Sequence, residues 1–178
     1  STGYGIAKYD NPEELSVSDR NNIGYQYTDC PLYWISVIYL NFAEAKAEMG
    51  SLTQDDLNNS INKLQARAGL PAMTTTPDAD PANNMGVSNL IWEIRRCRRC
   101  ELIMDNWYRY WDLIRWHQLD KLDSTKYPNT MLGANVSNVP DCEEATKNGY
   151  IDASDAQIRT YEAKHYFYPI PTTQLTLN

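Results

Sequence analysis

Apolar residues recur at helical spacing in the first half of the chain. Between about Leu32 and Met49 they follow steps of 3, 4, 3 and 4, which is the period of one face of an α-helix. The residues on this predicted core face are Ile35, Ile38, Phe42, Ala45 and Met49. Gly50 follows directly and favours the left-handed conformation that ends many helices. The pattern predicts a first helix that buries this face.

A second helix is predicted directly after the first. Thr53 and Asp56 have the spacing of a capping box, with Asp where Glu or Gln is usual. The apolar face of this helix comprises Leu57, Ile61, Leu64 and Ala68, and the helix ends at Gly69. The two helices form an antiparallel pair of about 37 residues, close to the length of one tetratricopeptide repeat. One such pair cannot bury both its faces, so it needs further helices to pack against.

The rest of the chain is predicted to contain two more helices and two long loops. Ser88 is placed to cap a third helix that reaches about Asn106, and an aromatic fourth helix follows from Trp107 to Leu119. Residues 1–30 and 120–178 lack a sustained period, and the prolines near the C-terminus require extended backbone. We therefore expect one domain over residues 1–178, mainly α, with a helical part at 32–119, tetratricopeptide-like helix pairs and long loops.

Composition and charge limit the classes of function. The net charge of −7 argues against a nucleic-acid partner, which would require a basic surface. The aromatic residues are 13 Tyr and 5 Trp against 2 Phe, a bias that suits half-wet surfaces and stacking on sugar rings. No apolar run reaches the roughly 18 residues that a membrane-spanning helix requires.

Charged residues on the apolar side of the third helix are the most unusual feature of the sequence. Arg98 and Glu101 have i, i+3 spacing and are expected to pair, which leaves Asp105 in need of another cation. Buried charges persist only when they are paired, so we interpret these residues as a structural network that joins two helices. Its predicted members are Arg98, Glu101, Asp105, Arg109, Asp112 and Arg115. The alternative, a catalytic carboxylate pair, is disfavoured because arginine partners keep carboxylates ionised.

Cys97 and Cys100 form a Cys-x-x-Cys motif, which suggests redox chemistry or zinc binding. Redox motifs of this type lie at the N-terminus of a helix, where the helix dipole favours the thiolate, whereas this motif lies in the middle of the third helix. A structural zinc site requires four ligands, and few other Cys or His residues are available. The sequence therefore predicts no catalytic residue, no metal site and no cofactor.

Five segments in the same order resemble the SusD/RagB family of nutrient-binding proteins. Ile94–Leu102 is similar to the family's RRERRxEL stretch, and Arg109–Trp116 is similar to RxxDLxRW. Tyr39–Ala45 resembles YLNYAEA, Ile61–Gly69 resembles INxVRxRAG, and Tyr168–Pro171 resembles the terminal YPIP. Each segment alone is a weak signal, but five in order are specific. The resemblance identifies the chain as the C-terminal part of such a protein, and therefore as a fragment.

The resemblance implies both an architecture and a cellular role. Family members are surface-exposed lipoproteins of the outer membrane, mostly from Bacteroidetes, with four tetratricopeptide-like helix pairs in an α-α superhelical fold. They cover a SusC-like TonB-dependent transporter as a lid and deliver oligosaccharides, or in some cases peptides, to it. The expected partners are thus an oligosaccharide or polysaccharide and the transporter, and the membrane is reached only through a lipid anchor that this chain lacks.

Ligand contacts are expected from loops outside the matched segments. Our candidates are the loop aromatics Tyr9, Tyr25 and Tyr27, with polar side chains fixing the sugar hydroxyls. The sequence predicts a glycan binder and no enzyme. Two alternatives remain open: a glycoside hydrolase, which needs only two carboxylates, and a helical-repeat module for protein interaction.

Overall fold

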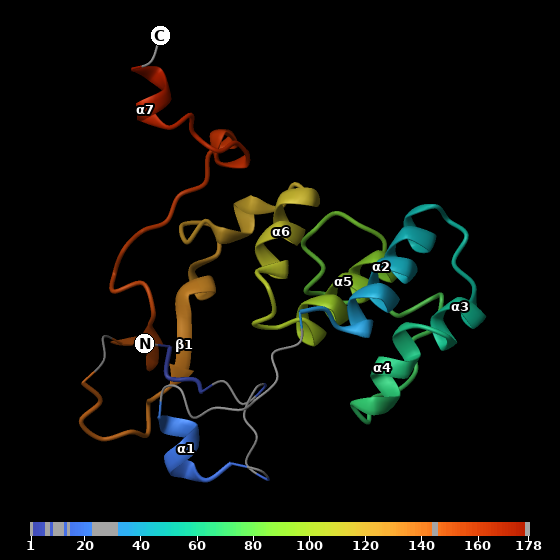
Figure 1. Ribbon diagram of the computed structural model, residues 1–178, viewed down its shortest axis with the longest axis horizontal. Helices are drawn as coiled ribbons and strands as arrows, with labels where there is room; N and C mark the ends of the chain where they lie inside the picture. Colours follow the sequence, from blue (N-terminus) through green and yellow to red (C-terminus); the bar gives the residue numbers. More distant parts are fainter. Residues whose placement is uncertain are drawn as a thin grey trace. The chain divides into compact units, whose positions relative to one another are not determined.

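The computed structural model describes residues 2–5, 8, 13, 15–22, 32–143 and 146–176 (Figure 1). The protein is mainly helical, with a small antiparallel sheet, which confirms the mainly α class predicted from the sequence. The chain divides into two compact units. We call Pro31–Asp112 the helical unit, and Ser1–Cys30 together with Leu113–Asn178 the sheet unit.

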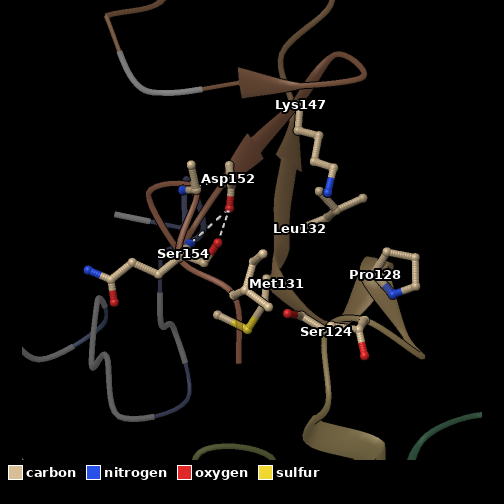
Figure 2. A pocket seen from close by; sticks show the side chains of 11 residues that line it. Ser124, Pro128, Met131, Leu132, Lys147, Asp152 and Ser154 are labelled. Carbon is tan, nitrogen blue, oxygen red and sulfur yellow. Dashed lines mark hydrogen bonds between the residues drawn. The ribbon is translucent and has the colours of Figure 1, made fainter. Parts of the chain in front are cut away.

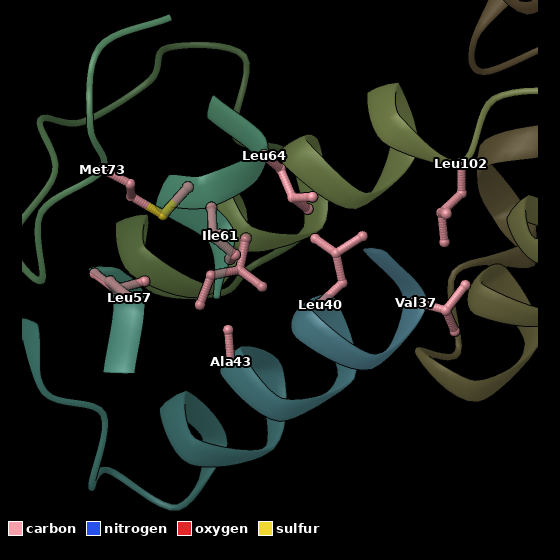
Figure 3. Close-up of a cluster of buried hydrophobic side chains, with 9 residues drawn as sticks. Val37, Leu40, Ala43, Leu57, Ile61, Leu64, Met73 and Leu102 are labelled. Atoms are coloured by element: carbon pink, nitrogen blue, oxygen red, sulfur yellow. The ribbon is translucent and has the colours of Figure 1, made fainter. Parts of the chain in front are cut away.

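The helical unit is built around one hydrophobic core. Its helices are α2 (Ile35–Glu48), α3 (Gln54–Asn58), α4 (Ile61–Arg67), α5 (Asn89–Glu101) and the first part of α6 (Tyr108–Arg115). Helix α2 packs against α4 and α5, and the core side chains meet between them (Figure 3). Leu40, Leu57, Ile61 and Ile94 are completely buried there. One residue from each of α2 to α5 thus joins a single cluster of apolar contacts.

Helix α2 buries a different face from the one that its sequence predicts. Val37, Leu40 and Ala43 point into the core (Figure 3). The predicted core residues are instead exposed, by 63% at Ile35, 59% at Ile38, 42% at Phe42 and 78% at Met49, and Ala45 is exposed as well. Both sets have helical spacing, so periodicity does not distinguish between them. The predicted core face was wrong, and α2 carries a second apolar stripe at the surface of the helical unit.

The predicted second helix is interrupted and forms α3 and α4. Its capping box is confirmed: Thr53 Oγ1 accepts from the Asp56 N–H at 3.1 Å, and the Asp56 carboxylate accepts from the Thr53 N–H at 2.9 Å. Further along, the Ser60 hydroxyl donates to the Asp56 carbonyl at 2.6 Å, while the Ser60 N–H donates to the Leu57 carbonyl. The hydroxyl thus takes the acceptor that the helical N–H would use, which explains the break.

The third and fourth helices are shorter than predicted. Helix α5 begins at the predicted cap, where Ser88 Oγ accepts from the Ile91 N–H at 3.3 Å, but it ends at Glu101. Positive φ angles follow at Met104 (64°), Asn106 (35°) and Trp107 (58°). Such backbone angles are rare for residues other than glycine and end a right-handed helix. The predicted extension of the third helix to Asn106 was therefore wrong, and α6 ends at Arg115 instead of Leu119.

The sheet unit contains regular structure that the sequence pattern did not predict. Its elements are α1 (Val17–Asn21), η1 (Leu119–Leu122), η2 (Pro128–Met131), β1 (Leu132–Asn135), β2 (Thr146–Lys147), β3 (Tyr150–Asp152), η3 (Ala163–Tyr166) and α7 (Thr172–Leu175). The strand order is β1-β3-β2, and all pairs are antiparallel. Asn148 and Gly149, both with positive φ, form the two-residue turn between β2 and β3. The segment before α1 reaches this sheet, because the Ala134 N–H donates to the Thr2 carbonyl at 2.8 Å.

The burial of α2 can be tested with two substitutions of the same kind. We expect Leu40→Ala to lower the free energy of unfolding by about 2–5 kcal/mol, because it opens a cavity in the core. Ile38→Ala removes an exposed side chain and should change it by at most about 0.5 kcal/mol. Urea unfolding followed by circular dichroism measures both values, and a larger effect of Ile38→Ala would show that the core face is misassigned.

Candidate ligand-binding pocket and buried ionic network

A buried arginine on α5 connects three helices of the helical unit. Arg98 Nε lies 2.7 Å from Asp112 Oδ2 on α6, and both residues are only 4% exposed. Arg98 Nη1 also donates to Asn41 Oδ1 on α2 at 2.7 Å. The guanidinium has a planar set of donors, so one side chain can satisfy a carboxylate and an amide at fixed angles. This contact sets the positions of α5, α6 and α2 relative to one another.

Three further ion pairs connect α5 to neighbouring helices. Arg95 lies 3.5 Å from Glu44 Oε1 and 3.3 Å from Glu48 Oε1, both on α2. Glu101 accepts two hydrogen bonds from Arg67 at the end of α4, at 2.7 and 2.6 Å. Arg95 and Glu44 were not among the predicted members of the network, because spacing along one helix does not show partners on another.

The network predicted from the sequence is present in part. The i, i+3 spacing suggested an Arg98–Glu101 pair, whereas the structure joins Arg98 to Asp112 and Glu101 to Arg67. Burial lowers the pKa of Arg109, with a further contribution from Arg99. Arg115, in the sheet unit, stacks over Trp116 at 4.7 Å. Asp105 is 2% exposed, and its pairing with Arg109 or Arg115 stays a prediction.

The sheet unit holds a small pocket beside the strands, lined by both polar and apolar side chains (Figure 2). We call it the sheet pocket; it has a volume of about 210 Å³, and its lining includes Ser124, Pro128, Met131, Lys147, Asp152 and Gln157. In Figure 2, Asp152 and Ser154 lie on one side of Met131, and Ser124 and Pro128 lie on the other. Pockets for drug-sized ligands have about 300–1,000 Å³, so this one is suited to a single small ring.

Two aspartates organise the loops around the sheet pocket. Asp152 accepts from the Ser154 hydroxyl at 2.6 Å and from the Ser154 N–H at 3.0 Å, which lowers the pKa of Asp152. Asp123, 4% exposed, accepts from the hydroxyl and N–H of Thr125 and from the Tyr161 N–H at 3.1 Å. These hydrogen bonds lower the pKa of Asp123 to about 2, and the bond from the Thr125 hydroxyl contributes most. Both carboxylates therefore serve as ionised acceptors that fix turns.

The structure describes the predicted Cys-x-x-Cys motif but not the three candidate tyrosines. Tyr9, Tyr25 and Tyr27 lie outside them, so their role as ligand contacts stays a prediction. Cys97, Cys100 and Cys142 are free thiols, and burial, with a smaller contribution from Glu101, raises the pKa of Cys97 to about 11. A protonated, buried thiol is a poor nucleophile. In the part of the chain that the structure describes, no three His, Cys, Asp or Glu side chains are grouped so that they could hold a metal ion.

The described residues thus combine a mainly helical scaffold, a buried ion pair and a small pocket lined by strand and loop residues. The sequence model of the SusD family matches residues 1–178, so the chain belongs to the SusD family. Members of this family bind carbohydrates, take part in nutrient uptake and act at the bacterial cell surface. Neither curated proteins nor solved structures gave a match to the chain. None of the described helices is long and apolar enough to cross a membrane.

The buried pair of Arg98 on α5 and Asp112 on α6 should contribute to stability and not to ligand binding. We expect Arg98→Ala to lower the free energy of unfolding by about 3–5 kcal/mol, because it leaves Asp112 buried without its main cation. Arg67→Ala removes an exposed arginine and should cost less than about 1 kcal/mol. Urea unfolding provides the measurement. An Arg98→Ala protein of normal stability that no longer binds glycan would contradict this assignment.

The low pKa of Asp123 predicts a pH dependence. An unfolded aspartate has a pKa of about 3.9, so the stabilisation by Asp123 is complete above that value and is lost as the pH falls toward about 2. We expect the amide NMR signals of Thr125 and Tyr161 to shift together in this pH range. Asp123→Asn should abolish the shift, whereas Asp155→Asn, at an exposed position, should retain it. Signals that titrate near pH 4 in the native protein would contradict the bonds described for Asp123.

Proposed function

We propose that the chain is part of a surface glycan-binding protein that delivers oligosaccharides to a SusC-like TonB-dependent transporter. The observation that carries the proposal is the match of the SusD family model over residues 1–178. The five resembling segments lie within this match and follow the family pattern in order. In this proposal the full-length protein is held at the outer membrane by a lipid anchor and takes part in polysaccharide utilisation.

We propose that the sheet pocket binds one sugar ring of the glycan. Lys147 and Gln157 supply donors, and Pro128, Met131 and Ile158 supply an apolar surface for the C–H face of a ring. Tyr9, Tyr25 and Tyr27 remain the candidate aromatic contacts for a glycan. Stacking by tyrosine suits this role because one ring offers both an apolar face and a hydroxyl.

The lowered pKa values of Asp123 and Asp152 in the sheet unit do not suit glycoside hydrolysis. A glycoside hydrolase needs one carboxylic acid whose pKa is raised, so that it can protonate the leaving oxygen. Hydrogen-bond donors lower the pKa of Asp123 and of Asp152, so neither is suited to that role. The glycoside hydrolase alternative therefore has no support from these two carboxylates.

One observation favours the second alternative, a role in protein interaction. The exposed stripe of α2 comprises Ile35, Ile38, Phe42 and Met49, each at least 42% exposed. A row of apolar side chains on one helix is typical of a surface that contacts another polypeptide. This role is compatible with glycan delivery, since a protein that passes its ligand to a transporter must also contact it.

Affinity electrophoresis on a polysaccharide panel tests the proposal. We expect at least one polysaccharide to retard the chain, and Tyr25→Ala or Tyr27→Ala to weaken retardation by about two- to tenfold, the range for one lost aromatic contact. Tyr33→Ala is the control, because Tyr33 is an exposed tyrosine outside the candidate set. Release of shorter products from labelled glycans, abolished by changing one carboxylate, would contradict a binding role, and so would the absence of any retardation.

A further inference from the structure

A second pocket lies in the helical unit, under the segment that links α4 to α5. Two anchors hold this segment against the helices. At the first, the Asn62 side chain accepts from the Met73 N–H at 2.7 Å and donates to the Met73 carbonyl at 3.1 Å. Gln54 Nε2 donates to the same carbonyl at 3.0 Å. Met73 is therefore fixed through its backbone as well as through its buried side chain.

The second anchor lies at Asp80. Its carboxylate accepts from Trp92 Nε1 on α5 at 2.9 Å and from the Ala82 N–H at 2.8 Å, and these bonds lower the pKa of Asp80. Residues 74–79 bridge the two anchors, and we call them the arch. Since both ends of the arch are fixed, the space between it and the helices is preformed.

The pocket between the arch and helices α4 and α5 has a volume of about 370 Å³. We call it the arch pocket, and this volume lies within the range of about 300–1,000 Å³ for small-molecule sites. Its polar lining comprises Gln65, Thr74, Thr76, Asp78, Glu93 and Arg96. The apolar part includes Leu70, Pro71 and Met73. Hydroxyl, amide and carboxylate groups thus surround a partly apolar floor.

Gln65 supplies an available hydrogen-bond acceptor to the arch pocket. It is only 8% exposed, and its side-chain N–H₂ has one weak contact, to Cys97 Sγ at 4.0 Å. Within the described residues, the Gln65 side-chain carbonyl accepts no hydrogen bond. This oxygen is not among the buried unsatisfied atoms, so it is open to the pocket and available to accept a hydrogen bond from a hydroxyl group of a ligand.

The charges of the lining restrict which ligand fits. Arg96 donates twice to Glu93 Oε2, at 2.9 and 2.6 Å, which holds the Glu93 carboxylate in place. Asp78 adds a second carboxylate, so the lining has two negative charges against one positive charge. An anionic ligand would be repelled, whereas neutral hydroxyl groups can donate to the carboxylates and to the Gln65 carbonyl and accept from Thr76.

We propose that the arch pocket is a second carbohydrate site, which binds one neutral sugar ring. This inference rests on the proposed glycan-binding function and adds a site in the helical unit, whose lining residues differ from those of the sheet pocket. The described lining of the arch pocket contains no aromatic residue. Its affinity for a single sugar should therefore be weak, with a dissociation constant of about 1 mM. Its role is to hold a further sugar of a glycan that is bound elsewhere or a second glycan chain.

Methionine methyl NMR on the full chain tests this site. Met73 lines the arch pocket and Met131 lines the sheet pocket, so each methyl signal reports one site. Titration with methyl glucoside and methyl galactoside should shift the Met73 signal to saturation. Methyl glucuronide, which carries a carboxylate, should bind more weakly, and Asp78→Asn should reduce this discrimination because it removes one negative charge.

Three consecutive threonines supply matched variants. Thr76 lines the arch pocket and Thr75 does not. Thr76→Val removes a hydroxyl at nearly constant shape and should weaken sugar binding at Met73 by about two- to tenfold, whereas Thr75→Val should leave it unchanged. Circular dichroism establishes that both variants are folded.

The possible outcomes separate this inference from the proposed function. If a polysaccharide retards the chain but no neutral glycoside shifts Met73, the arch pocket is not a sugar site and the proposed function stands. Equal effects of Thr75→Val and Thr76→Val would overturn the inference as well. If no polysaccharide retards the chain and neither methionine responds, both proposals fail.

Discussion

The hydrogen-bonded pair between Arg98 and Asp112 is the constraint on which the helical unit depends. A guanidinium and a carboxylate that are both almost completely buried lose most of their hydration, and only close contact compensates for that loss. Because Arg98 also binds Asn41, the geometry of α2, α5 and α6 has to satisfy one planar group. The family-like segments that contain Arg98 and Asp112 are therefore part of the scaffold.

The sequence predicted the existence of helices better than their faces and ends. Sequence spacing located α2, the capping box of α3 and the cap of α5, because these features depend on residues close together in the chain. It chose the wrong face of α2, since Val37, Leu40 and Ala43 have the same period as the exposed stripe and only packing against α4 and α5 distinguishes them. The interruption at Ser60 also depends on a side-chain bond that propensity does not reveal.

The candidate sites were less predictable than the fold. The β2–β3 hairpin had a usable signal, the Asn148-Gly149 pair, which favours a two-residue turn. Neither pocket had such a signal, because Gln65, Asp78 and Arg96 approach one another only after α4, the arch and α5 have packed. Partners in the ionic network that lie on another helix, such as Glu44 and Arg67, cannot be found from spacing for the same reason.

The attachment of the arch has a consequence for how ligand preference can evolve. Its two anchors, at Met73 and Asp80, lie outside residues 74–79, and the described contacts of Thr74, Thr76 and Asp78 include no hydrogen bond that the helices depend on. Substitutions in the arch can therefore alter the pocket without loosening the scaffold. Selection can act on recognition and on folding separately, and this separation would let related proteins adapt to new nutrients through few changes.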